Sequence, residues 1–306
     1  MQLKVGSLFC GAGGFDLGFI QAGHKILWAI DSDIECCETY RKNIGNQVIC
    51  KNINDINFDK LQEIDIIIGG FPCQGFSVAN LNRTGSDERN YLYKFFIKAL
   101  EIKKPDLFLA ENVRGILSLD GGEVIKKIIS DFSELGYEVE CKLINAADYG
   151  VPQTRKRVFI VGTKKESRLE FDWPTPTNLN NWISVKEALK EIPEPDAVHN
   201  LKNHIGSKNK IRFTDFTSHR ATNPNKPSPT ILTPTWGAMP HPSNKRRMTI
   251  REHALIQTFP LDFEFYGKTM GSLYKQVGNA VPVKLAFELA KGFKKRKDDI
   301  KKGYLF

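Results

Sequence analysis

One cysteine of this chain lies in a turn rich in glycine and proline, directly after its most apolar segment. The segment at 64–69, IDIIIG, is followed by GFPCQGFS, so Cys73 sits on a loop that Pro72 stiffens. The carboxyl ends of strands in an open parallel sheet form the ligand site, which positions this thiol for chemistry. A thiol with a pKa of about 8.5 is little ionised at neutral pH, yet it is a strong nucleophile. The alternative is a loop cysteine without a role, and the lack of a nearby histidine gives no support to a papain-like pair.

A glutamate follows another apolar run. The segment DLFLA at 106–110 is followed by Glu111, in the sequence AENVR. A carboxyl group flanked by apolar walls holds its proton more readily than one in water, which suits a general acid. A helix-capping or surface glutamate is the alternative.

A glycine-rich turn joins the first apolar run to the first helical segment. Glycines in FCGAGGFDLG (9–18) allow close approach of the backbone to a ligand, and a helix N-terminus attracts negative charge. The third glycine of a dinucleotide fingerprint is replaced by Asp16, whose carboxylate would repel a pyrophosphate. It would instead suit a cation, such as the amino group or sulfonium of S-adenosylmethionine (AdoMet). Asp31, after the second apolar run, is placed to bind ribose hydroxyls; a purely structural turn is the alternative.

A basic row precedes the apolar segment at 158–161. In QTRKR, the residues Gln153, Arg155 and Arg157 alternate, so an extended backbone would point them to one side. The row is either an anion- or base-binding surface or a charged edge strand.

The elements that must position these residues alternate between strand and helix. Such alternation predicts an α/β fold with a mostly parallel sheet and helices on both faces. The predicted strands are 4–9, 26–31, 48–49, 64–69, 106–110, 139–144 and 158–161, and the predicted helices are 14–22, 34–43, 91–103 and 123–135.

The second half of the chain has a different texture. Proline-dense segments after residue 162 exclude central strands and helix interiors. We therefore expect a smaller, loop-rich domain at 165–270, and a larger domain made of 1–164 and 271–306. Helices are expected again at 249–257 and 283–293, and the segment GSLYKQVGNAVP between them is sheet-like.

Composition narrows the class of protein. The chain has 306 residues, 41% hydrophobic and 26% charged, which is typical of a soluble globular protein. It has no run of about 20 apolar residues that could span a bilayer and no basic region of a signal peptide, so a cytoplasmic location is expected. The six cysteines form no C-x-x-C pair, and no histidine cluster has zinc-finger spacing, so no metal site is expected.

The net charge of +9 is concentrated in one segment. Residues 197–251 hold ten lysines and arginines and a single acid, Asp215. Such a segment is either a solvated basic surface or a surface that faces a polyanion.

Taken together and in this order, the motifs resemble those of the DNA (cytosine-5) methyltransferases of bacterial modification systems. The matching blocks are FCGAGGFDLGF, GGFPCQGFS, ENV, QTRKRVFIVG, RRMTIREHALIQTFP and YKQVGNAVP, and they span nearly the whole chain. The resemblance implies a Rossmann-like AdoMet-dependent catalytic domain, which would be 1–164 and 271–306. It also implies a target-recognition domain, which would be 165–270.

The resemblance also assigns roles in catalysis. Cys73, next to Pro72, would attack carbon 6 of cytosine, and Glu111 would bond and protonate ring nitrogen 3. Arg155 would hold the base carbonyl, with Gln153 beside it. On the cofactor side, Phe9 would stack on adenine, Asp31 would bind the ribose in place of the commoner glutamate, Asp55 would bind the adenine amino group, Leu92 and Asn279 would line the methionine end, and Gly11, Gly13 and Gly14 would form the turn.

A substrate inside duplex DNA requires the target base to be flipped out. The resemblance implies a loop at 77–90 that closes over this base, and a variable region at about 172–222 that reads a short sequence. Candidate DNA contacts are Arg83, Arg89, Arg157, Arg212, Arg220, Arg246 and Arg247. It further implies a monomer on double-stranded DNA, a bacterial, nucleoid-associated location, and a cognate restriction endonuclease as genetic partner.

Three other functions compete with this interpretation. An RNA methyltransferase of the same scaffold is disfavoured because the Cys-Phe-Thr triplet of that branch is absent. A non-catalytic DNA-binding protein is disfavoured because Cys73 and Glu111 are both present. A nicotinamide oxidoreductase is disfavoured by Asp16, and it leaves the basic segment unexplained.

Overall fold

A computed structural model of the chain describes residues 1–71, 92–205, 222–231, 239–243 and 246–296. Several residues singled out above lie outside this part of the chain: Pro72, Cys73, Arg83, Arg89, Arg212 and Arg220.

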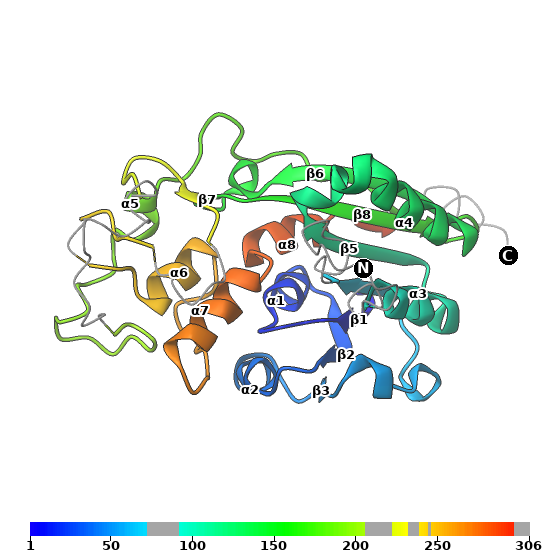
Figure 1. The fold of residues 1–306 in the computed structure, drawn as a ribbon, viewed down its shortest axis with the longest axis horizontal. Coiled ribbons are helices and arrows are strands. Elements are labelled where there is room, and N and C mark those ends of the chain that lie inside the picture. Colours follow the sequence, from blue (N-terminus) through cyan, green and yellow to red (C-terminus); the bar gives the residue numbers. More distant parts are fainter. Residues whose placement is uncertain (72–91, 206–221, 232–238, 244–245, 297–306) are drawn as a thin grey trace, which may run out of the picture.

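A seven-stranded sheet forms the centre of the fold (Figure 1). The first five strands in spatial order are parallel to one another, whereas the sixth runs antiparallel to the strands on either side. The prediction of a mostly parallel α/β sheet is therefore confirmed. In spatial order the strands are β3 (Val48–Cys50), β2 (Lys25–Asp31), β1 (Lys4–Leu8), β4 (Ile66–Gly69), β5 (Leu107–Val113), β8 (Lys156–Lys164) and β6 (Tyr137–Asn145).

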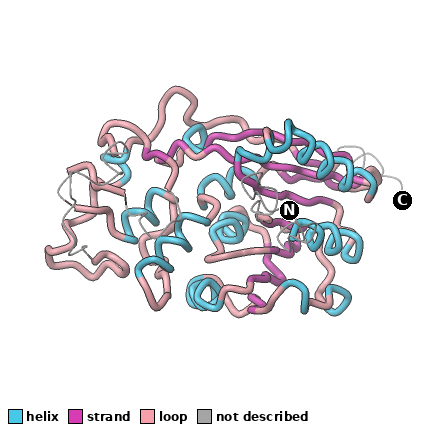
Figure 2. The backbone as a smooth tube through the Cα atoms, viewed as in Figure 1, coloured by secondary structure: helices cyan, strands magenta, loops and turns pink. Residues whose placement is uncertain are grey.

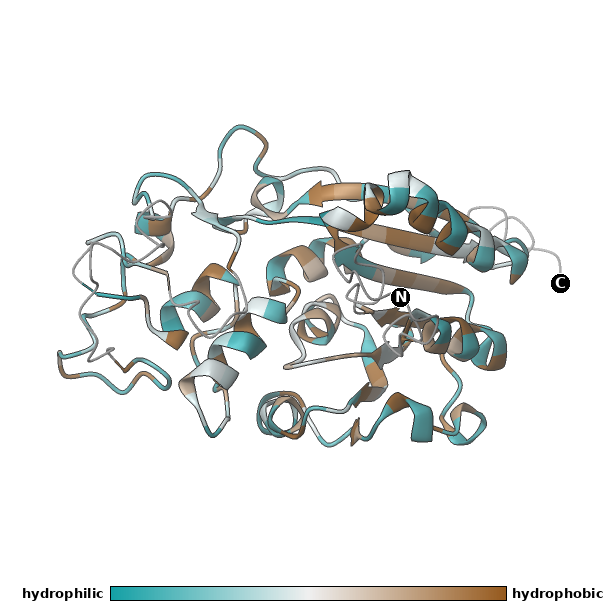
Figure 3. Ribbon diagram, viewed as in Figure 1, coloured by the Kyte–Doolittle hydropathy of each residue, from teal (hydrophilic) through white to brown (hydrophobic). Residues whose placement is uncertain are grey.

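Helices cover both faces of the sheet, and each face has its own apolar core. One core joins the sheet to α1 (Gly14–Gln21), α2 (Ile34–Asn43) and α8 (Val283–Ala290). The other joins it to α3 (Leu92–Lys103) and α4 (Glu123–Glu134). Figure 3 shows the central strands as predominantly hydrophobic ribbons between these helices. Short 3-10 helices complete the described connections: η1 (Ile53–Asp55), η2 (Phe58–Lys60), η5 (Arg114–Leu117), η6 (Leu119–Gly122) and η7 (Ala146–Tyr149).

The first and last helices of the described chain pack directly against each other. Helix α1 carries Gly18 at the contact, where a Cβ atom would lie 2.4 Å from the Cβ atom of Ala286 in α8. His24, after α1, also contacts the carbonyl oxygen of Ala290 at 3.1 Å. Helix α8 is thereby joined to the start of the chain, and the division into 1–164 with 271–306 and 165–270 stays a prediction.

Strand β5 extends further than the sequence predicts. Its pairing with β8 continues through Glu111↔Phe159, Asn112↔Val158 and Val113↔Arg157, because the antiparallel partner offers ladder hydrogen bonds beyond the end of β4. Glu111 is therefore inside the strand and not after its end.

The expectation of sheet-like structure at 271–282 is wrong. Most of this segment forms helix α7 (Met270–Asn279), which begins at the N-cap Thr269, whose side chain accepts a hydrogen bond from the backbone amide of Ser272. Leu273 and Val277 lie one turn apart on its buried face. This helical spacing outweighs the β-branched and glycine residues that suggested a strand. The predicted helix at 283–293 ends at Ala290, and Phe293–Lys295 forms strand β11.

The segment 165–270 is rich in loops, as predicted (Figure 2). Its beginning is attached to the large domain, since β9 (Leu169–Phe171) pairs antiparallel with β11. A small core of its own gathers apolar side chains around α5 (Val185–Ala188) and α6 (Ile250–Ile256). A further cluster joins α6 and α7 to Ala12 of the glycine-rich turn. A second two-stranded ladder pairs β10 (Ser228–Pro229) with β7 (Gln153–Thr154).

Among the described residues, no helix combines the length and the apolarity needed to cross a bilayer.

Candidate active site

A cavity of about 1020 Å³ opens at the carboxyl ends of β1, β2, β4 and β5. This edge is where open α/β sheets bind their ligands. The turn after β1 and the residues at the end of α7 both contribute to its wall. The cavity is lined by these residues that the sequence singled out: Phe9, Gly11, Asp31, Leu92, Glu111, Arg155, Arg157 and Asn279.

The glycine-rich turn takes its shape from left-handed backbone conformations. Gly13, with φ of 89°, is the N-cap of α1, and Gly11 has φ of 53°. Neither Gly13 nor Gly14 lines the cavity. A Cβ atom at Gly14 would lie 2.5 Å from the carbonyl oxygen of Val281, so this glycine permits α1 to approach the segment after α7.

Asp31 presents a partly bonded carboxylate to the cavity. One oxygen accepts the backbone N–H of Gly11 at 2.8 Å, and the other accepts the N–H of Asp33 at 2.8 Å. Burial raises the pKa of Asp31, and these hydrogen bonds from backbone amides oppose that increase. An ionised carboxylate accepts about four hydrogen bonds, so capacity remains for ligand hydroxyl groups.

Asp16 does not face the cavity, so the proposed contact with a cationic ligand is wrong. Its two oxygens accept the hydroxyls of Ser7 at 2.6 Å and Tyr40 at 2.7 Å, and the side chain is fully buried. Burial raises its pKa to about 6. The first turn of α1 directs this side chain toward β1 and α2, which turns it away from the ligand.

Of the two residues predicted to contact adenine, Phe9 lines the cavity and Asp55 does not. Asp55, at the end of η1, is exposed and does not line the cavity. Asn52 and Ile53 line it in that region instead. The side chain of Asn52 accepts the backbone N–H of Asn54, which fixes the start of η1. The contact between Asp55 and the adenine amino group stays a prediction.

Glu111 lies beside the base of the loop that carries Cys73. The carboxylate oxygen Oε2 is close to Gly70, where a Cβ atom would approach it to 3.0 Å. The neighbouring Asn112 donates from Nδ2 to the carbonyl oxygen of Phe71 at 3.0 Å. Two adjacent residues of β5 thus contact the two residues that precede Pro72. The amide of Asn112 is a positioning group that the sequence analysis missed, although its place directly after Glu111 was a usable signal.

A guanidinium group holds the other side of Glu111. Arg157 Nε lies 3.0 Å from Glu111 Oε1, and both side chains are nearly buried, at 15% and 13% exposure. Arg157 therefore belongs to the cavity, which differs from its predicted place on a DNA-binding surface.

The side chains of the basic row at 153–157 lie in two different places. Arg155 and Arg157 line the cavity, whereas Gln153 is fully buried behind it. The backbone N–H of Arg155 bonds the carbonyl of Gln153, so the chain bends between β7 and β8 and alternation is lost. Arg155 donates to the carbonyl oxygen of Gly278 at 3.0 Å, and burial, together with a smaller effect of the nearby Arg157, lowers its pKa to about 9.

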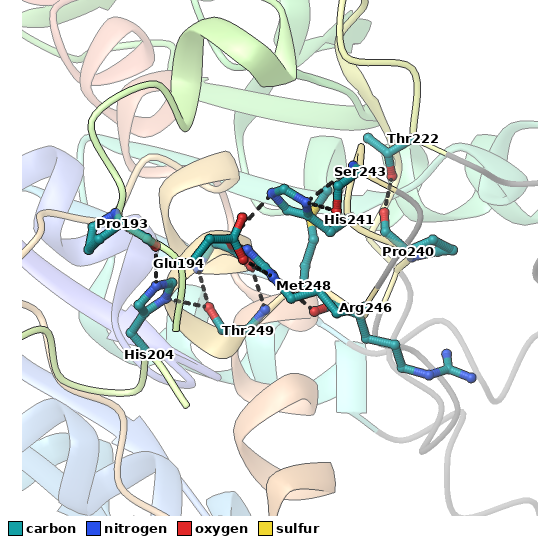
Figure 4. Close-up of polar contacts among 12 residues, drawn as sticks. Pro193, Glu194, His204, Thr222, Pro240, His241, Ser243, Arg246, Met248 and Thr249 are labelled. Atoms are coloured by element: carbon teal, nitrogen blue, oxygen red, sulfur yellow. Dashed lines mark hydrogen bonds and ion pairs between the residues drawn. The ribbon is translucent and has the colours of Figure 1, made fainter. Parts of the chain in front are cut away.

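Two basic residues of the segment 197–251 form hydrogen bonds with other groups of the protein. Arg246 donates two hydrogen bonds of 2.8 Å to Glu252 and one of 2.7 Å to Glu194 (Figure 4). Arg251 is fully buried and bonds the carbonyl oxygens of Lys202, Pro260 and Phe263. The predicted DNA contact at Arg246 stays a prediction, and in the structure its guanidinium pairs with two carboxylates.

Further side chains stabilise the same polar cluster. His204 contacts the hydroxyl of Thr249 at 2.9 Å, and Thr249 forms a capping box with Glu252 at the start of α6. His241 lies 3.6 Å from Glu252 (Figure 4). Arg247, another predicted DNA contact, is also engaged in an interaction.

No group of three or more histidines, cysteines and acids with metal-binding geometry occurs in the part of the chain that the structure describes.

Comparison with known proteins agrees with this arrangement. The chain belongs to the C-5 cytosine-specific DNA methylase family, whose model matches residues 3–295. The chain is 38% identical to the Type II methyltransferase M.NgoFVII of Neisseria gonorrhoeae, over 94% of this chain and 85% of that protein. It is also 38% identical to the Type II methyltransferase M.MthTI of Methanothermobacter thermautotrophicus, over 96% of this chain and 98% of that protein.

Solved structures give the same class. A prophage-encoded E. coli protein described as a DNA modification methyltransferase matches with a TM-score of 0.75 and 26% identity, over 95% of this chain and 98% of that one. The Dnmt2 methyltransferase of S. pombe matches in fold, with a TM-score of 0.72 and 18% identity, over 94% and 97% of the two chains. The chain is accordingly a DNA (cytosine-5) methyltransferase with relatives of restriction–modification type.

Proposed function

We propose that this protein transfers a methyl group from AdoMet to carbon 5 of a cytosine within a short, specific sequence of double-stranded DNA. The observation that carries the proposal is the position of Glu111. Its carboxylate touches the base of the Cys73 loop, pairs with Arg157, and shares one cavity with the Asp31–Gly11 pair. A proton-transfer group and a nucleotide-binding turn are thereby brought to the same ligand.

The residues of the cavity fit AdoMet. When bound, AdoMet supplies the electrophilic methyl group. Asp31 would accept hydrogen bonds from ribose hydroxyls, and Phe9 and Ile53 would hold the adenine ring. Leu92 and Asn279 would flank the methionine end, and Gly11, Gly13 and Gly14 would keep the turn open.

The chemistry of the base rests on two side chains. The Cys73 thiolate adds to carbon 6 of cytosine while Glu111 gives a proton to nitrogen 3, which makes carbon 5 nucleophilic. Methyl transfer leaves S-adenosylhomocysteine. The proton at carbon 5 then passes to solvent, the Cys73 thiolate leaves with the electrons of its bond to carbon 6, and the proton on nitrogen 3 returns to Glu111, which restores the aromatic ring. Pro72 and the Asn112–Phe71 hydrogen bond support the loop.

The contact between Arg157 and Glu111 supports a change in the expected roles. Arg157 is the guanidinium group beside Glu111, so we assign the base carbonyl to Arg157 and not to Arg155, whose guanidinium bonds the Gly278 carbonyl. Gln153 acts behind the cavity and not on the base.

The target cytosine must leave the duplex to reach this cavity, at a cost of a few kcal/mol. We assign closure over the base to the loop at 77–90, with Arg83 and Arg89, and sequence recognition to the domain at 165–270. Arg212, Arg220 and Arg247 are its proposed DNA contacts. A monomer on nucleoid DNA that protects it from a cognate restriction endonuclease completes the proposal.

Bisulfite sequencing of DNA from a methylation-free host that expresses the chain tests this function. One short motif, modified at a single cytosine, is expected. The Cys73→Ala variant, expressed to the same level, is the control and should leave the motif unmodified. Unmodified DNA from soluble wild-type protein that binds AdoMet would contradict the proposal and would favour an RNA substrate or a non-catalytic role.

A further inference from the structure

The part of the cavity wall at the end of α7 is held by side chains from two distant segments. Gln257 donates from Nε2 to the carbonyl oxygens of Val277 at 2.8 Å and Ala280 at 3.1 Å. Arg155 donates to the carbonyl oxygen of Gly278 at 3.0 Å. Three carbonyl groups at the end of α7 are therefore bonded by only two side chains.

These carbonyl groups need such partners. The last carbonyls of a helix lack intrahelical donors, and a buried carbonyl left unbonded costs free energy. A cation at the C-terminal end of a helix also interacts favourably with the helix dipole. The guanidinium of Arg155 supplies this cation, and its side chain is only 2% exposed.

Two of these three carbonyl groups, those of Gly278 and Ala280, belong to residues that line the ligand cavity. Gly278, Asn279, Ala280 and Val281 are consecutive and all line it. The wall contains no regular strand or helix beyond Asn279, because α7 ends there and α8 begins at Val283. The bonds from Gln257 and Arg155 therefore determine where this wall lies.

A second amide extends this network to the segment 228–231. Gln153 donates from Nε2 to Gln257 Oε1 at 2.8 Å, and Gln153 Oε1 accepts the backbone N–H of Ile231 at 3.0 Å. Both glutamines are fully buried. The ladder between β7 and β10 and the bond from Thr230 to the carbonyl of Thr154 bind the same segment to β7.

We propose that Gln257 and Arg155 are positioning residues for the cofactor wall at 278–281, and that Gln153 acts through Gln257 to join this wall to the recognition side of the protein. The identity of the ligand as AdoMet rests on the proposed function. The arrangement of the wall itself does not, so the two can be tested separately.

The first experiment uses Gln257→Met, a substitution of similar volume that forms no hydrogen bonds. Hydrogen exchange of the backbone amides at 277–281 is measured in the ligand-free protein, and AdoMet binding is measured by calorimetry. Exchange of these amides is expected to rise at least tenfold, and the dissociation constant for AdoMet about tenfold. The control is Asn43→Leu, which removes an amide that also bonds two carbonyl groups but lies outside the cavity.

The control should lower thermal stability without changing either quantity at 277–281. Unchanged exchange and unchanged AdoMet affinity in folded Gln257→Met would overturn the proposal. A wild-type protein that does not bind AdoMet would contradict the proposed function, while the exchange measurement would still decide the role of Gln257.

The second experiment tests whether Gln153 acts through Gln257. Gln153→Met keeps both bonds from Gln257 to the wall, so it should raise exchange at 277–281 less than Gln257→Met does. It also provides the measurement if Gln257→Met does not fold. The double variant should bind AdoMet no more weakly than Gln257→Met alone, since the two residues act in series. Additive losses of AdoMet affinity would refute this arrangement.

Discussion

The central sheet and the region 165–270 are built by different means. On the side of β1 and β2, the ligand-facing groups follow strands directly: Asp31 ends β2, and Gly11 follows β1. In the region 165–270, the polar groups are held by one another: Arg246 joins Glu252 on α6 to Glu194, about fifty residues earlier. Figure 2 shows the same contrast, since strands dominate one region and loops the other.

This difference determines what each region tolerates. A strand in the middle of a sheet orients its side chains through the ladder, so one altered side chain leaves its neighbours in place. A polar network without regular structure depends on each partner, because removing one leaves a buried group unsatisfied. Substitutions on the sheet side are therefore expected to change chemistry, and those in the network to change stability.

The largest effect on chemistry is expected for Cys73→Ala. Loss of the nucleophile should abolish methylation, because carbon 5 of cytosine is not nucleophilic enough without addition at carbon 6. Transfer of tritiated methyl groups to DNA measures the rate, and AdoMet binding should be unchanged. Cys141→Ala, which removes an exposed cysteine on β6, is the matched control and should be fully active. Turnover by Cys73→Ala would refute the mechanism.

The next effect is expected for Glu111→Gln. The amide keeps the shape of the carboxylate but is not a general acid, so the rate of methyl transfer should fall about 10²- to 10⁴-fold. Single-turnover kinetics measures it. Glu138→Gln, an exposed carboxylate on β6, is the control. A rate within twofold of wild type would remove Glu111 from the chemistry.

Substitutions in the polar network around Arg246 are expected to change stability and not chemistry. Arg246→Met leaves Glu252, only 1% exposed, without its cation, so the free energy of unfolding should fall by about 3 to 5 kcal/mol. Glu194→Gln removes the other partner, which is 65% exposed, and should cost less than about 1 kcal/mol. Urea unfolding measures both. Equal losses in the two variants would show that burial does not govern this network.

A dependence of stability on pH is expected from Asp16. Burial raises its folded pKa to about 6, above the unfolded value of 3.8. The folded state therefore binds the extra proton, so this contribution to stability is fully present below about pH 4 and is lost as the pH rises through 6, by roughly 3 kcal/mol. Asp16→Asn should remove this decline in unfolding free energy between pH 4 and 7. An unchanged pH profile would contradict the assignment.

The site residues that could be predicted from the sequence were those with a local signal in it. Phe9, Gly11, Asp31 and Glu111 all line the cavity, because each lies at or near the end of a strand that the apolar pattern predicted. Asn279 also lines it, but at the end of a helix that the sequence pattern did not predict. Asp55 and Gln153 do not reach it. Their side-chain directions depend on a 3-10 turn and on a bend in the backbone, which leave no trace in residue spacing.

The role of the basic residues in the second half of the chain was the hardest feature to predict from the sequence. Ten basic residues in 197–251 predicted a surface for polyanions, yet Arg246 and Arg251 bond carboxylates and carbonyl groups inside the protein. Both acids that pair with Arg246 lie outside this segment. Glu194 lies just before its start, and Glu252 lies just after its end. Counting charge within a segment misses partners that only folding brings together.

The sequence alone determined the alternation of strands and helices, the mostly parallel sheet, the glycine-rich turn and the family of the protein, because these depend on apolar periodicity and on motifs within short stretches. The tertiary structure decided which of two aspartates faces the ligand, which arginine meets Glu111, and which glutamine holds the cavity wall. These choices depend on contacts between residues about 20 to 120 positions apart, such as Arg155 with Gly278 and Gly11 with Asp31. Such contacts exist only after the sheet has formed and fixed the direction of each side chain.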